Sequence, residues 1–549
     1  MPDAFELPRI ESGVPRLDSI LHGGLPQRSI CVIAGRPGSG KTVLTHQMLF
    51  NQINKDRRAL YLTTLAEPAI KMVRYMQTFR FANRARMNSD LRYMDIGDTL
   101  RDDGMDAVFD RIGQALKETR PTFVCVDSIK AVERMMEHER QPPGQFSHRL
   151  AVLLATWDAT GLLVGEYDEE ETHKPVFTVA DSVILLRNVR QGMYQQRYLE
   201  VLKLRGSTFF GGLHPYRISG DGVEVFERVK TPEKSIDPPV NAKRVPSGIA
   251  EFDDMLSGGL QAGSATMIAG GSGTGKTLLG LSFVTAAAER GDRSIIVSFQ
   301  ENPAQLEQIA SSFGWRLGDL KRSGLVDHIY HSPVEIQPDT HVHALIQAVE
   351  RAPTQLVVLD SLKDLETPTP DKSRYKDFLY SLVTELKARG ITVLLTNEIP
   401  ELFGPFQFSE HGVSFITDTI VLLRYVELAG RMSRAINIMK MRGSQHSKDI
   451  REFAMDETGI RVLDPITAYS GVMSGMPSHS EQPAVRHLPR ASRHLLEVIR
   501  RVGPSTTDQI VKATGLDQGI VFAELAQLEQ QGLVLLLHQN NENRYRATV

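Results

Sequence analysis

Short apolar runs, many of them rich in β-branched residues, alternate with helical stretches along much of the chain. Between residues 265 and 397 the apolar runs are ATMIAG, SIIVSF, LVVLDS and ITVLLTN. We expect helices between them, starting at Lys276, at Pro303 and at about Lys376, the last one extending to Arg389. Continuous apolar strands separated by amphipathic helices are typical of a parallel sheet covered on both faces. The pattern therefore predicts an α/β three-layer sandwich.

The same order of segments occurs twice. SGVPRLDSILHGGLPQRSICVIAGRPGSGKT, from Ser12, aligns with SGIAEFDDMLSGGLQAGSATMIAGGSGTGKT, from Ser247. Further along, ADSVILLRNVRQGMYQQRYLEVLKLRGS aligns with TDTIVLLRYVELAGRMSRAINIMKMRGS. Repeats of this length indicate two homologous domains, which we place at residues 1–230 and 247–465. Residues 231–246 contain four prolines, so we expect a stiff, extended linker there.

The pattern changes after the second repeat. Residues 466–489 are rich in Gly, Ser, Pro and His without clear periodicity, which indicates a flexible tail or linker. Residues 490–549 then predict three helices, the second ended by Gly515, and two strands joined by a turn at Asn540–Asn541. Three helices followed by a β-hairpin is the order of a winged helix-turn-helix.

Composition narrows the class of protein. The 549 residues include 63 Lys and Arg against 66 Asp and Glu, a net charge of −3, which disfavours a protein that coats nucleic acid electrostatically. The two cysteines, Cys31 and Cys125, lie in apolar runs, so we expect buried thiols and no disulfide framework or cysteine zinc site. The sequence contains no signal-peptide pattern and no apolar run of membrane-spanning length. We therefore expect a cytoplasmic protein.

Each repeat carries a complete phosphate-binding loop (P-loop) after an apolar strand and before a helix. Glycines let backbone N–H groups turn toward one anion, the lysine reaches the terminal phosphates, and the threonine hydroxyl binds Mg²⁺. The loop residues are Gly35, Gly38, Ser39, Gly40, Lys41 and Thr42 in the first repeat, and Gly270, Gly273, Thr274, Gly275, Lys276 and Thr277 in the second. The sequence therefore predicts two sites for ATP with Mg²⁺.

Acidic residues at the ends of other strands are candidates for the rest of each site. Asp127 and Asp360 end apolar strands after the loop, where an acid that orders the magnesium shell is expected. Glu67 and Glu301 follow the strand that comes directly after the phosphate-loop helix and are candidates to orient or deprotonate water, although the helix dipole alone also favours acids at such positions. Glu166 and Glu398 are weaker candidates, for sensing the γ-phosphate.

These features resemble the KaiC family of circadian-clock ATPases and autokinases over about residues 8–480. The resemblance rests on the paired P-loops, on SGxxxxDxxLxGGL before each loop, and on TDTIVLLRYVELAGRMSRAINIMKMRGSQHSKDIREF. It implies two tandem RecA-like domains in a hexameric double ring, with nucleotide bound between neighbouring subunits. By the same resemblance, Lys203, Arg205, Lys440 and Arg442 would reach the nucleotide of the adjacent subunit. The alternative is an ordinary solvated strand, on which basic residues two apart share a face.

The family phosphorylates itself on adjacent Ser and Thr residues in its second domain. The matching positions here are Ser414 and Phe415, so one acceptor is kept and one is lost, and Ser409 matches a further hydroxyl. The family's Glu-Glu pair is also reduced, because Ala66 precedes Glu67 and Gln300 precedes Glu301. The resemblance therefore implies serine autophosphorylation without an ordered two-site cycle.

The C-terminal part departs further from the family. YSGVMSGMPS, from Tyr469, resembles the family tail that receives a regulatory protein, but the winged-helix-like end lies outside the family pattern. Its third helix, expected at 517–531, has three acids and no basic residue. DNA readout normally places Arg, Lys or Asn on that helix, so we favour a protein-interaction or ring-stacking module.

The leading hypothesis is an ATP-hydrolysing, self-phosphorylating ring that acts in signalling or timer-like regulation. The reduced carboxylate pairs favour a second hypothesis, a nucleotide-gated scaffold with negligible turnover. A DNA-dependent RecA-like ATPase is the third hypothesis, and net charge disfavours it.

Overall fold

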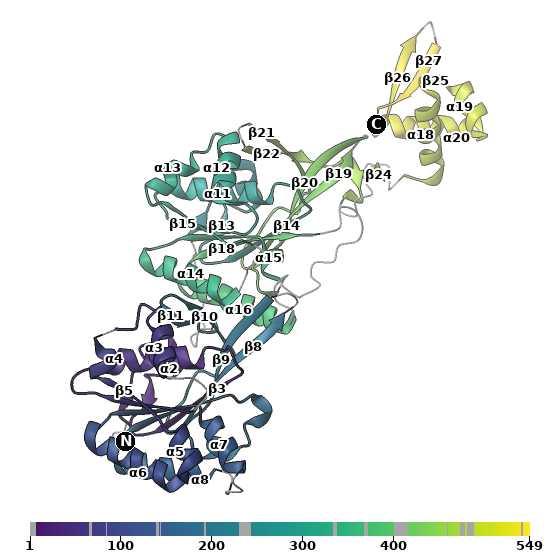
Figure 1. Cartoon of the computed structure of the whole chain (residues 1–549). Coiled ribbons are helices and arrows are strands. Elements are labelled where there is room, and N and C mark those ends of the chain that lie inside the picture. The colour runs from purple at the N-terminus through teal and green to yellow at the C-terminus, as the bar shows by residue number, and fades with distance from the viewer. Residues whose placement is uncertain are drawn as a thin grey trace, which may run out of the picture. The chain divides into compact units, whose positions relative to one another are not determined.

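A nine-stranded, mostly parallel sheet forms the centre of each repeat in the computed structural model (Figure 1). The structure describes residues 7–64, 69–83, 85–138, 142, 144–191, 194–229, 243–332, 338–366, 372–399, 415–428, 430–457, 459–472, 478–479, 488–539 and 542–548. The chain divides into two compact units, the first comprising 1–236, 329–353 and 364–389, and the second 237–328, 354–363 and 390–549. Each phosphate loop and the strands beside it lie within one unit.

The first sheet has the strand order β11-β10-β9-β8-β3-β7-β6-β4-β5. Its strands are β3 (Ile30–Gly35), β4 (Ala59–Thr63), β5 (Leu91–Asp95), β6 (Phe123–Asp127), β7 (Thr160–Gly165), β8 (Ser182–Gln191), β9 (Tyr194–Leu204), β10 (His214–Ser219) and β11 (Gly222–Val225). Strands from β5 to β8 pair in parallel, and β8 to β11 continue the sheet as an antiparallel extension.

The second sheet repeats this order as β22-β21-β20-β19-β14-β18-β17-β15-β16. Its strands are β14 (Ala265–Gly270), β15 (Ser294–Ser298), β16 (Val326–Tyr330), β17 (Leu356–Asp360), β18 (Thr392–Glu398), β19 (Thr419–Leu428), β20 (Arg431–Met441), β21 (Arg451–Asp456) and β22 (Gly459–Pro465). The two halves therefore share one topology, as the sequence repeat predicted.

Side chains of β3 alternate between two apolar cores. Cys31 and Ile33 belong to the core that includes Leu44 of α2 (Lys41–Gln52), whereas Val32 belongs to the core that includes Ile112 of α6 (Gly104–Thr119). Figure 1 shows α2 on one side of this sheet and α6 on the other. One apolar core on each face of the sheet confirms the predicted three-layer sandwich. It also explains the continuous apolar run of β3, because a strand buried on both faces needs apolar residues at every position.

The other helices of the first half connect or flank these strands. They are α1 (Leu17–Ile20), α3 (Ala69–Met76), α4 (Arg86–Ser89), α5 (Gly97–Asp102), α7 (Ile129–His138), α8 (Gln145–Thr156) and α9 (Pro175–Val179), with a short 3₁₀ turn at Glu169–Glu171.

Helices of the second half match most of the expected positions. They are α10 (Ala250–Met255), α11 (Lys276–Glu289), α12 (Pro303–Ser312), α13 (Leu317–Arg322), α14 (Pro338–Arg351), α15 (Leu362–Glu366) and α16 (Lys372–Ala388). Helix α12 begins at Pro303 because Asn302 caps it, accepting from the N–H groups of Ala304 and Gln305. Helix α16 begins four residues before the expected Lys376.

A two-residue β-ribbon precedes each phosphate loop. It pairs β1 (Arg9–Ile10) with β2 (Leu25–Pro26), and β12 (Arg244–Val245) with β13 (Leu260–Gln261). Asp18 and Asp253 fix the turn after the first strand of each ribbon: their Oδ1 atoms accept from the N–H groups of Ser12 and Ser247, each at 2.7 Å. The repeated SGxxxxDxxLxGGL motif is thus a structural element. Strand β12 lies at the end of the segment expected as a linker.

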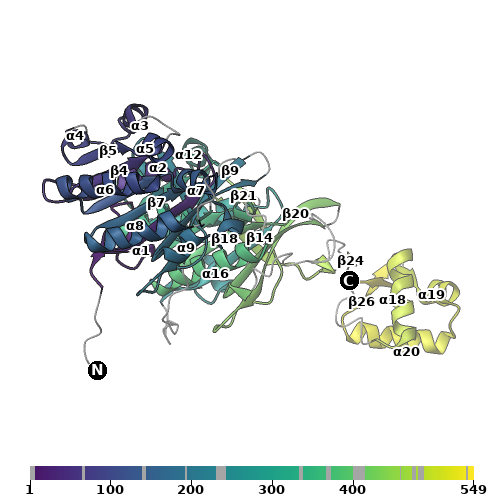
Figure 2. The ribbon, with the colours of Figure 1, turned by 60° about the horizontal axis from the view of Figure 1, so that its bottom comes forward.

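The C-terminal module has the order expected of a winged helix (Figure 2). It comprises α18 (Arg490–Val502), β25 (Ser505–Thr506), α19 (Thr507–Thr514), α20 (Gln518–Gln530), β26 (Val534–Gln539) and β27 (Glu542–Ala547). Gly515 ends α19 in the left-handed conformation with φ of 69°, as predicted. The short strand β25, which pairs with β27, was not predicted. Upstream, β23 (Tyr469–Ser470) pairs with β24 (Ser478–His479) inside the expected tail.

Both cysteines are fully buried and free, as expected. Within the described ranges, no helix is long and apolar enough to cross a membrane.

Candidate functional site

The first phosphate loop connects β3 to α2 through backbone shapes that require glycine. Gly40 precedes α2 with φ of 89°, in the left-handed region. A Cβ atom on Gly35 would lie 2.4 Å from the carbonyl oxygen of Leu186 and 2.7 Å from Oγ of Ser39. The first N–H groups of a helix have no partner within it, so the start of α2 offers donors and a positive dipole end to an anion.

Lys41 is folded back onto this loop. Its side chain is buried, and its Nζ donates to the carbonyl oxygens of Gly35, at 2.9 Å, and Arg36, at 3.1 Å. Burial lowers the pKa of Lys41, while the carboxylates of Glu166 and Asp127 raise it. The ammonium group therefore lies where an incoming phosphate would replace weak carbonyl acceptors with a strong anionic one.

Thr42 and Asp127 come together beside Lys41, as their sequence positions predicted. Thr42 Oγ1 donates to Asp127 Oδ2 at 2.9 Å, and Tyr61 Oη donates to the same oxygen at 2.8 Å. Burial raises the pKa of Asp127, and the two hydroxyl donors oppose that rise. A hydroxyl and a carboxylate at this spacing are hard oxygen ligands that suit Mg²⁺; nucleotide phosphates and water would complete its shell.

The second site repeats this geometry. Gly275 precedes α11 with φ of 98°, and Lys276 Nζ donates to the carbonyl oxygen of Gly271 at 2.8 Å. Thr277 Oγ1 donates to Asp360 Oδ2 at 2.6 Å, and Thr396 Oγ1 donates to the other oxygen of the same carboxylate. Two copies of one lysine–threonine–aspartate arrangement on equivalent strands indicate two sites built for the same ligand.

Acidic residues converge on Lys276 from the ends of two strands, β17 and β18, and from the segment after a third, β15. Burial lowers the pKa of this lysine, and Glu398, Asp360 and Glu301 raise it. The expected carboxylate Glu301 therefore lies near the phosphate loop, where its main-chain oxygen also accepts from Ser298 Oγ at 2.7 Å. Glu67, Ser409 and Ser414 lie outside the described residues, so their positions stay predictions.

A second lysine, which the sequence analysis missed, accompanies each phosphate loop. Lys130 and Lys363 each follow the strand-ending aspartate by three residues and occupy the second position of α7 and α15. The charge of Lys130 lowers the pKa of Lys41, and that of Lys363 lowers the pKa of Lys276, so each second lysine lies near the phosphate loop of its own half. A lysine three residues after the strand-ending aspartate occurs in both repeats, and this recurrence is the sequence signal that could have found the pair.

The basic residues of the first half lie toward the end of the sheet opposite to their own phosphate loop. Lys203 pairs with Val183 of β8, and Val183 pairs in turn with Val32 of β3, three residues before the loop begins. Lys203 Nζ donates to the carbonyl oxygen of Phe177 at 3.2 Å, and Arg205 pairs with Asp181 at 3.3 Å. These cations therefore lie toward the amino end of β3, whereas the loop follows its carboxyl end.

The second half has the same arrangement. Lys440 pairs with Ile420, which adjoins Met267 of β14, and Lys440 Nζ donates to the carbonyl oxygen of Thr417 at 2.7 Å. The Arg442 N–H donates to the carbonyl oxygen of Asp418. All four predicted cations thus lie far from the phosphate loop of their own domain.

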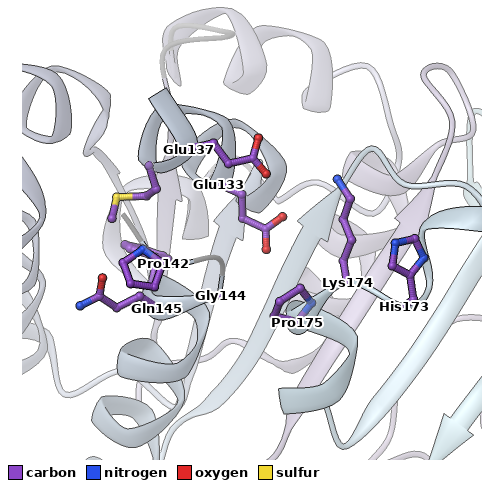
Figure 3. Close-up of a pocket in the computed structure, with 10 residues that line it drawn as sticks. Glu133, Glu137, Pro142, Gly144, Gln145, His173, Lys174 and Pro175 are labelled. Atoms are coloured by element: carbon purple, nitrogen blue, oxygen red, sulfur yellow. The ribbon is translucent and has the colours of Figure 1, made fainter. Parts of the chain in front are cut away.

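A cavity of about 180 Å³ lies between α7, α8 and α9 in the first half (Figure 3). Glu133 and Glu137 line it from α7, and His173 and Lys174 line it from the segment before α9. Tyr167 connects it with the phosphate site, because its hydroxyl donates to Glu133 while Lys130 Nζ lies 5.0 Å from its ring centre. The network around Lys130 therefore extends beyond the phosphate loop.

Comparison with known proteins assigns the family. The family model described as "ATPase: KaiC" matches residues 10–230 and 245–466. The chain belongs to the KaiC ATPase family. This confirms the resemblance predicted from the sequence and the tandem RecA-like architecture.

Individual relatives match most of the chain. The circadian clock oscillator protein KaiC of Thermostichus vulcanus is 30% identical over 505 residues, which cover 90% of this chain and 96% of the relative. KaiC of Picosynechococcus sp. is 30% identical over 483 residues, covering 86% and 92%. The circadian clock protein KaiC3 of Synechocystis sp. is 29% identical over 495 residues, covering 87% and 96%. The chain therefore spans nearly the whole length of these relatives.

Proposed function

We propose that the chain is an ATP-hydrolysing ring protein that binds Mg-ATP in both halves and acts in signalling or timer-like regulation. The observation that carries the proposal is the duplicated arrangement of Lys41, Thr42 and Asp127, and of Lys276, Thr277 and Asp360. A glycine loop that cradles an anion, a buried lysine and a hydroxyl–carboxylate pair together suit a nucleoside triphosphate with its magnesium ion. Membership of the KaiC ATPase family supports the nucleotide part of this proposal.

Each residue has a definite task in this proposal. The main-chain N–H groups at the start of α2 and α11 hold phosphate oxygens, and Lys41 and Lys276 neutralise the terminal phosphates. The threonine–aspartate pairs hold the magnesium shell, and bound Mg-ATP supplies the phosphoryl group that is transferred. Glu67 and Glu301 orient or deprotonate the attacking water.

The same proposal places the nucleotide between copies of the chain. The four predicted cations lie toward the end of the sheet opposite to their own phosphate loop. The nucleotide that they would contact is therefore that of a neighbouring copy. These cations are Lys203, Arg205, Lys440 and Arg442. Repeated head-to-tail contact of this kind closes into a ring when the rotation permits. We propose a hexameric double ring, in keeping with the family.

Autophosphorylation of Ser414 is the second activity of the proposal. Phosphoryl transfer depends mostly on positioning and charge neutralisation, so Lys440, Arg442 and the magnesium ligands would support it even with Gln300 in place of an acid. We expect slow transfer for that reason. Ser409 is the second acceptor that we propose.

A nucleotide-gated scaffold with negligible turnover is the competing function. Ala66 and Gln300 favour it, because each replaces one carboxylate of the family's pair. Incubation of the purified full-length chain with Mg-ATP, followed by mass spectrometry and phosphate release, distinguishes the two. Released phosphate and a phosphorylated serine support the enzyme; bound ATP recovered intact supports the scaffold.

We further propose that the C-terminal module binds protein rather than DNA. Helix α20 carries acids and no basic residue, and Phe522 on it is 54% exposed next to the buried Val521. An exposed aromatic side chain on an acidic helix suits a protein surface better than a phosphate backbone. Stimulation of ATP turnover by DNA would contradict the proposed protein-binding role of the module and revive the DNA-dependent motor.

The tail from Tyr469 is the segment that we expect to receive a regulatory protein.

A further inference from the structure

The two second lysines hold equivalent positions but differ in exposure and in the acceptors beside them. Lys130 has a side chain that is 14% exposed, whereas that of Lys363 is 47% exposed. Each lies near the phosphate-loop lysine of its own half and contacts the carboxyl end of the next strand of the sheet. The contact is with Glu166, directly after β7, in the first half and with Glu398, the last residue of β18, in the second. Their different surroundings give the two nucleotide sites different freedom to respond to a ligand.

In the first half, Lys130 is fixed by several acceptors. Its Nζ donates to both carboxylate oxygens of Glu171, at 2.7 and 2.8 Å, and to the main-chain oxygen of Glu166 at 2.5 Å. The ring of Tyr167 lies against the same ammonium group. Desolvation alone would raise the pKa of Glu171, but hydrogen bonds from Lys130 and Lys174 lower it to about 2. This lysine therefore positions residues 166–171 and is not available to a phosphate.

In the second half, Lys363 pairs with Glu398 at 3.1 Å, a carboxylate that also faces Lys276. The ion pair is partly exposed, so it costs little to open. A terminal phosphate bound on Lys276 would bring negative charge toward Glu398 and offer Lys363 a stronger acceptor than the carboxylate. Bound ADP would lack that acceptor.

Resting on the proposed ATP site of the second half, we propose that Lys363 discriminates ATP from ADP there: it leaves Glu398 and pairs with the γ-phosphate. Lys130 has no such role in the first half and acts as a positioning residue. ATP and ADP would thus place the Lys363–Glu398 pair in two different states, and a ligand shifts such an equilibrium by its difference in affinity for the two states. Nucleotide state would be read in the second half alone.

Equilibrium binding to the full-length chain carrying Lys41→Ala, so that only the second half binds, tests the proposal. Fluorescent ADP and a non-hydrolysable ATP analogue are titrated separately, with and without Lys363→Met. We expect the variant to weaken the ATP analogue about tenfold and to leave ADP affinity within about twofold, because one charged hydrogen bond is lost only with ATP. Glu398→Gln should act in the opposite direction and tighten the ATP analogue, since Lys363 no longer has to leave a carboxylate.

Lys321→Met is the matched control. Lys321 forms a lysine–glutamate pair of the same kind with Glu307 at 2.7 Å, between α13 and α12, and its removal should leave both affinities unchanged. Equal weakening of both nucleotides in Lys363→Met, or no change in either, would overturn the proposal while leaving the ATP site in place. Failure of the parent chain to bind either nucleotide would instead overturn the proposed function together with this inference.

Discussion

Replacement of Arg205 by alanine is the prediction that tests most sharply where the basic residues act. The Arg205 N–H bonds to the carbonyl oxygen of Asp181, whose neighbour Ser182 pairs with Cys31, near the amino end of β3. At about 3.3 Å per residue, the main chain of Arg205 lies roughly 15 Å along the sheet from Gly35, where the loop begins. The structure thus separates this arginine from the phosphates of its own chain.

That distance sets the expected magnitude. Two unit charges roughly 15 Å apart in water interact by about 0.3 kcal/mol before salt screening, so an effect on the same chain's nucleotide would be negligible. At about 4 Å across an interface with an effective dielectric constant near 20, the same pair is worth about 4 kcal/mol, or roughly 10³ in rate. Arg205→Ala should therefore abolish first-half turnover almost as completely as Lys41→Ala, but only if Arg205 acts on a neighbouring copy.

Mixed rings turn this into a direct assay. Arg205→Ala and Lys41→Ala chains are combined 1:1, allowed to exchange subunits, and compared in ATP turnover with each variant alone, which reports the second half only. In randomly mixed rings, about a quarter of the interfaces combine an intact loop from one chain with an intact arginine from its neighbour. About a quarter of first-half turnover should therefore return. Lys41→Ala mixed with the double variant Lys41→Ala/Arg205→Ala is the control and should regain nothing. Unchanged turnover in Arg205→Ala alone, or no gain on mixing, would show that Arg205 does not act on the nucleotide of a neighbouring copy.

Three further predictions concern assembly, turnover and phosphorylation. Lys276→Ala should weaken nucleotide-dependent assembly, because sites between subunits couple binding to association; light scattering with and without Mg-ATP measures this, and a monomer under both conditions in the wild type would contradict the ring. Glu67→Gln and Glu301→Gln together should slow hydrolysis by about 10²- to 10⁴-fold without changing nucleotide affinity, and unchanged turnover would exclude both carboxylates as bases. Ser414→Ala should remove the phosphate that phosphopeptide mapping finds in the wild type, and the same label in the variant would exclude Ser414.

Local sequence signals predicted the central parts of both sites because those parts are contiguous. The strand, glycine loop and helix around Lys41 follow one another in the chain, and backbone geometry at Gly35 and Gly40 admits few other residues. Asp127 was predictable because an apolar strand ending in an acid occurs at the same place in both repeats. Its hydrogen bond with Thr42 then followed from strand order, since β6 and β3 lie on either side of β7.

Other features could not be predicted because their determinants are distant in sequence. Duplication marks the positions of Lys130 and Lys363 but not their roles, because those roles depend on acceptors more than thirty residues away in the chain. Strand β25 has two residues and exists because β27, at the end of the chain, pairs with it. The start of helix α16 at Lys372 was placed too late from the sequence, because the first turn, Lys-Ser-Arg-Tyr, lacks the apolar periodicity that marked the centre of the helix.

Nucleotide stoichiometry tests most directly the claim that both halves bind Mg-ATP. Calorimetric titration of the full-length chain with a non-hydrolysable ATP analogue and Mg²⁺ should give two bound nucleotides per chain. Lys41→Ala and Lys276→Ala, which remove the buried ammonium groups on Gly35 and Gly271, should each leave one. The combination of both changes should leave none. One nucleotide per wild-type chain, or two in either single variant, would contradict the account.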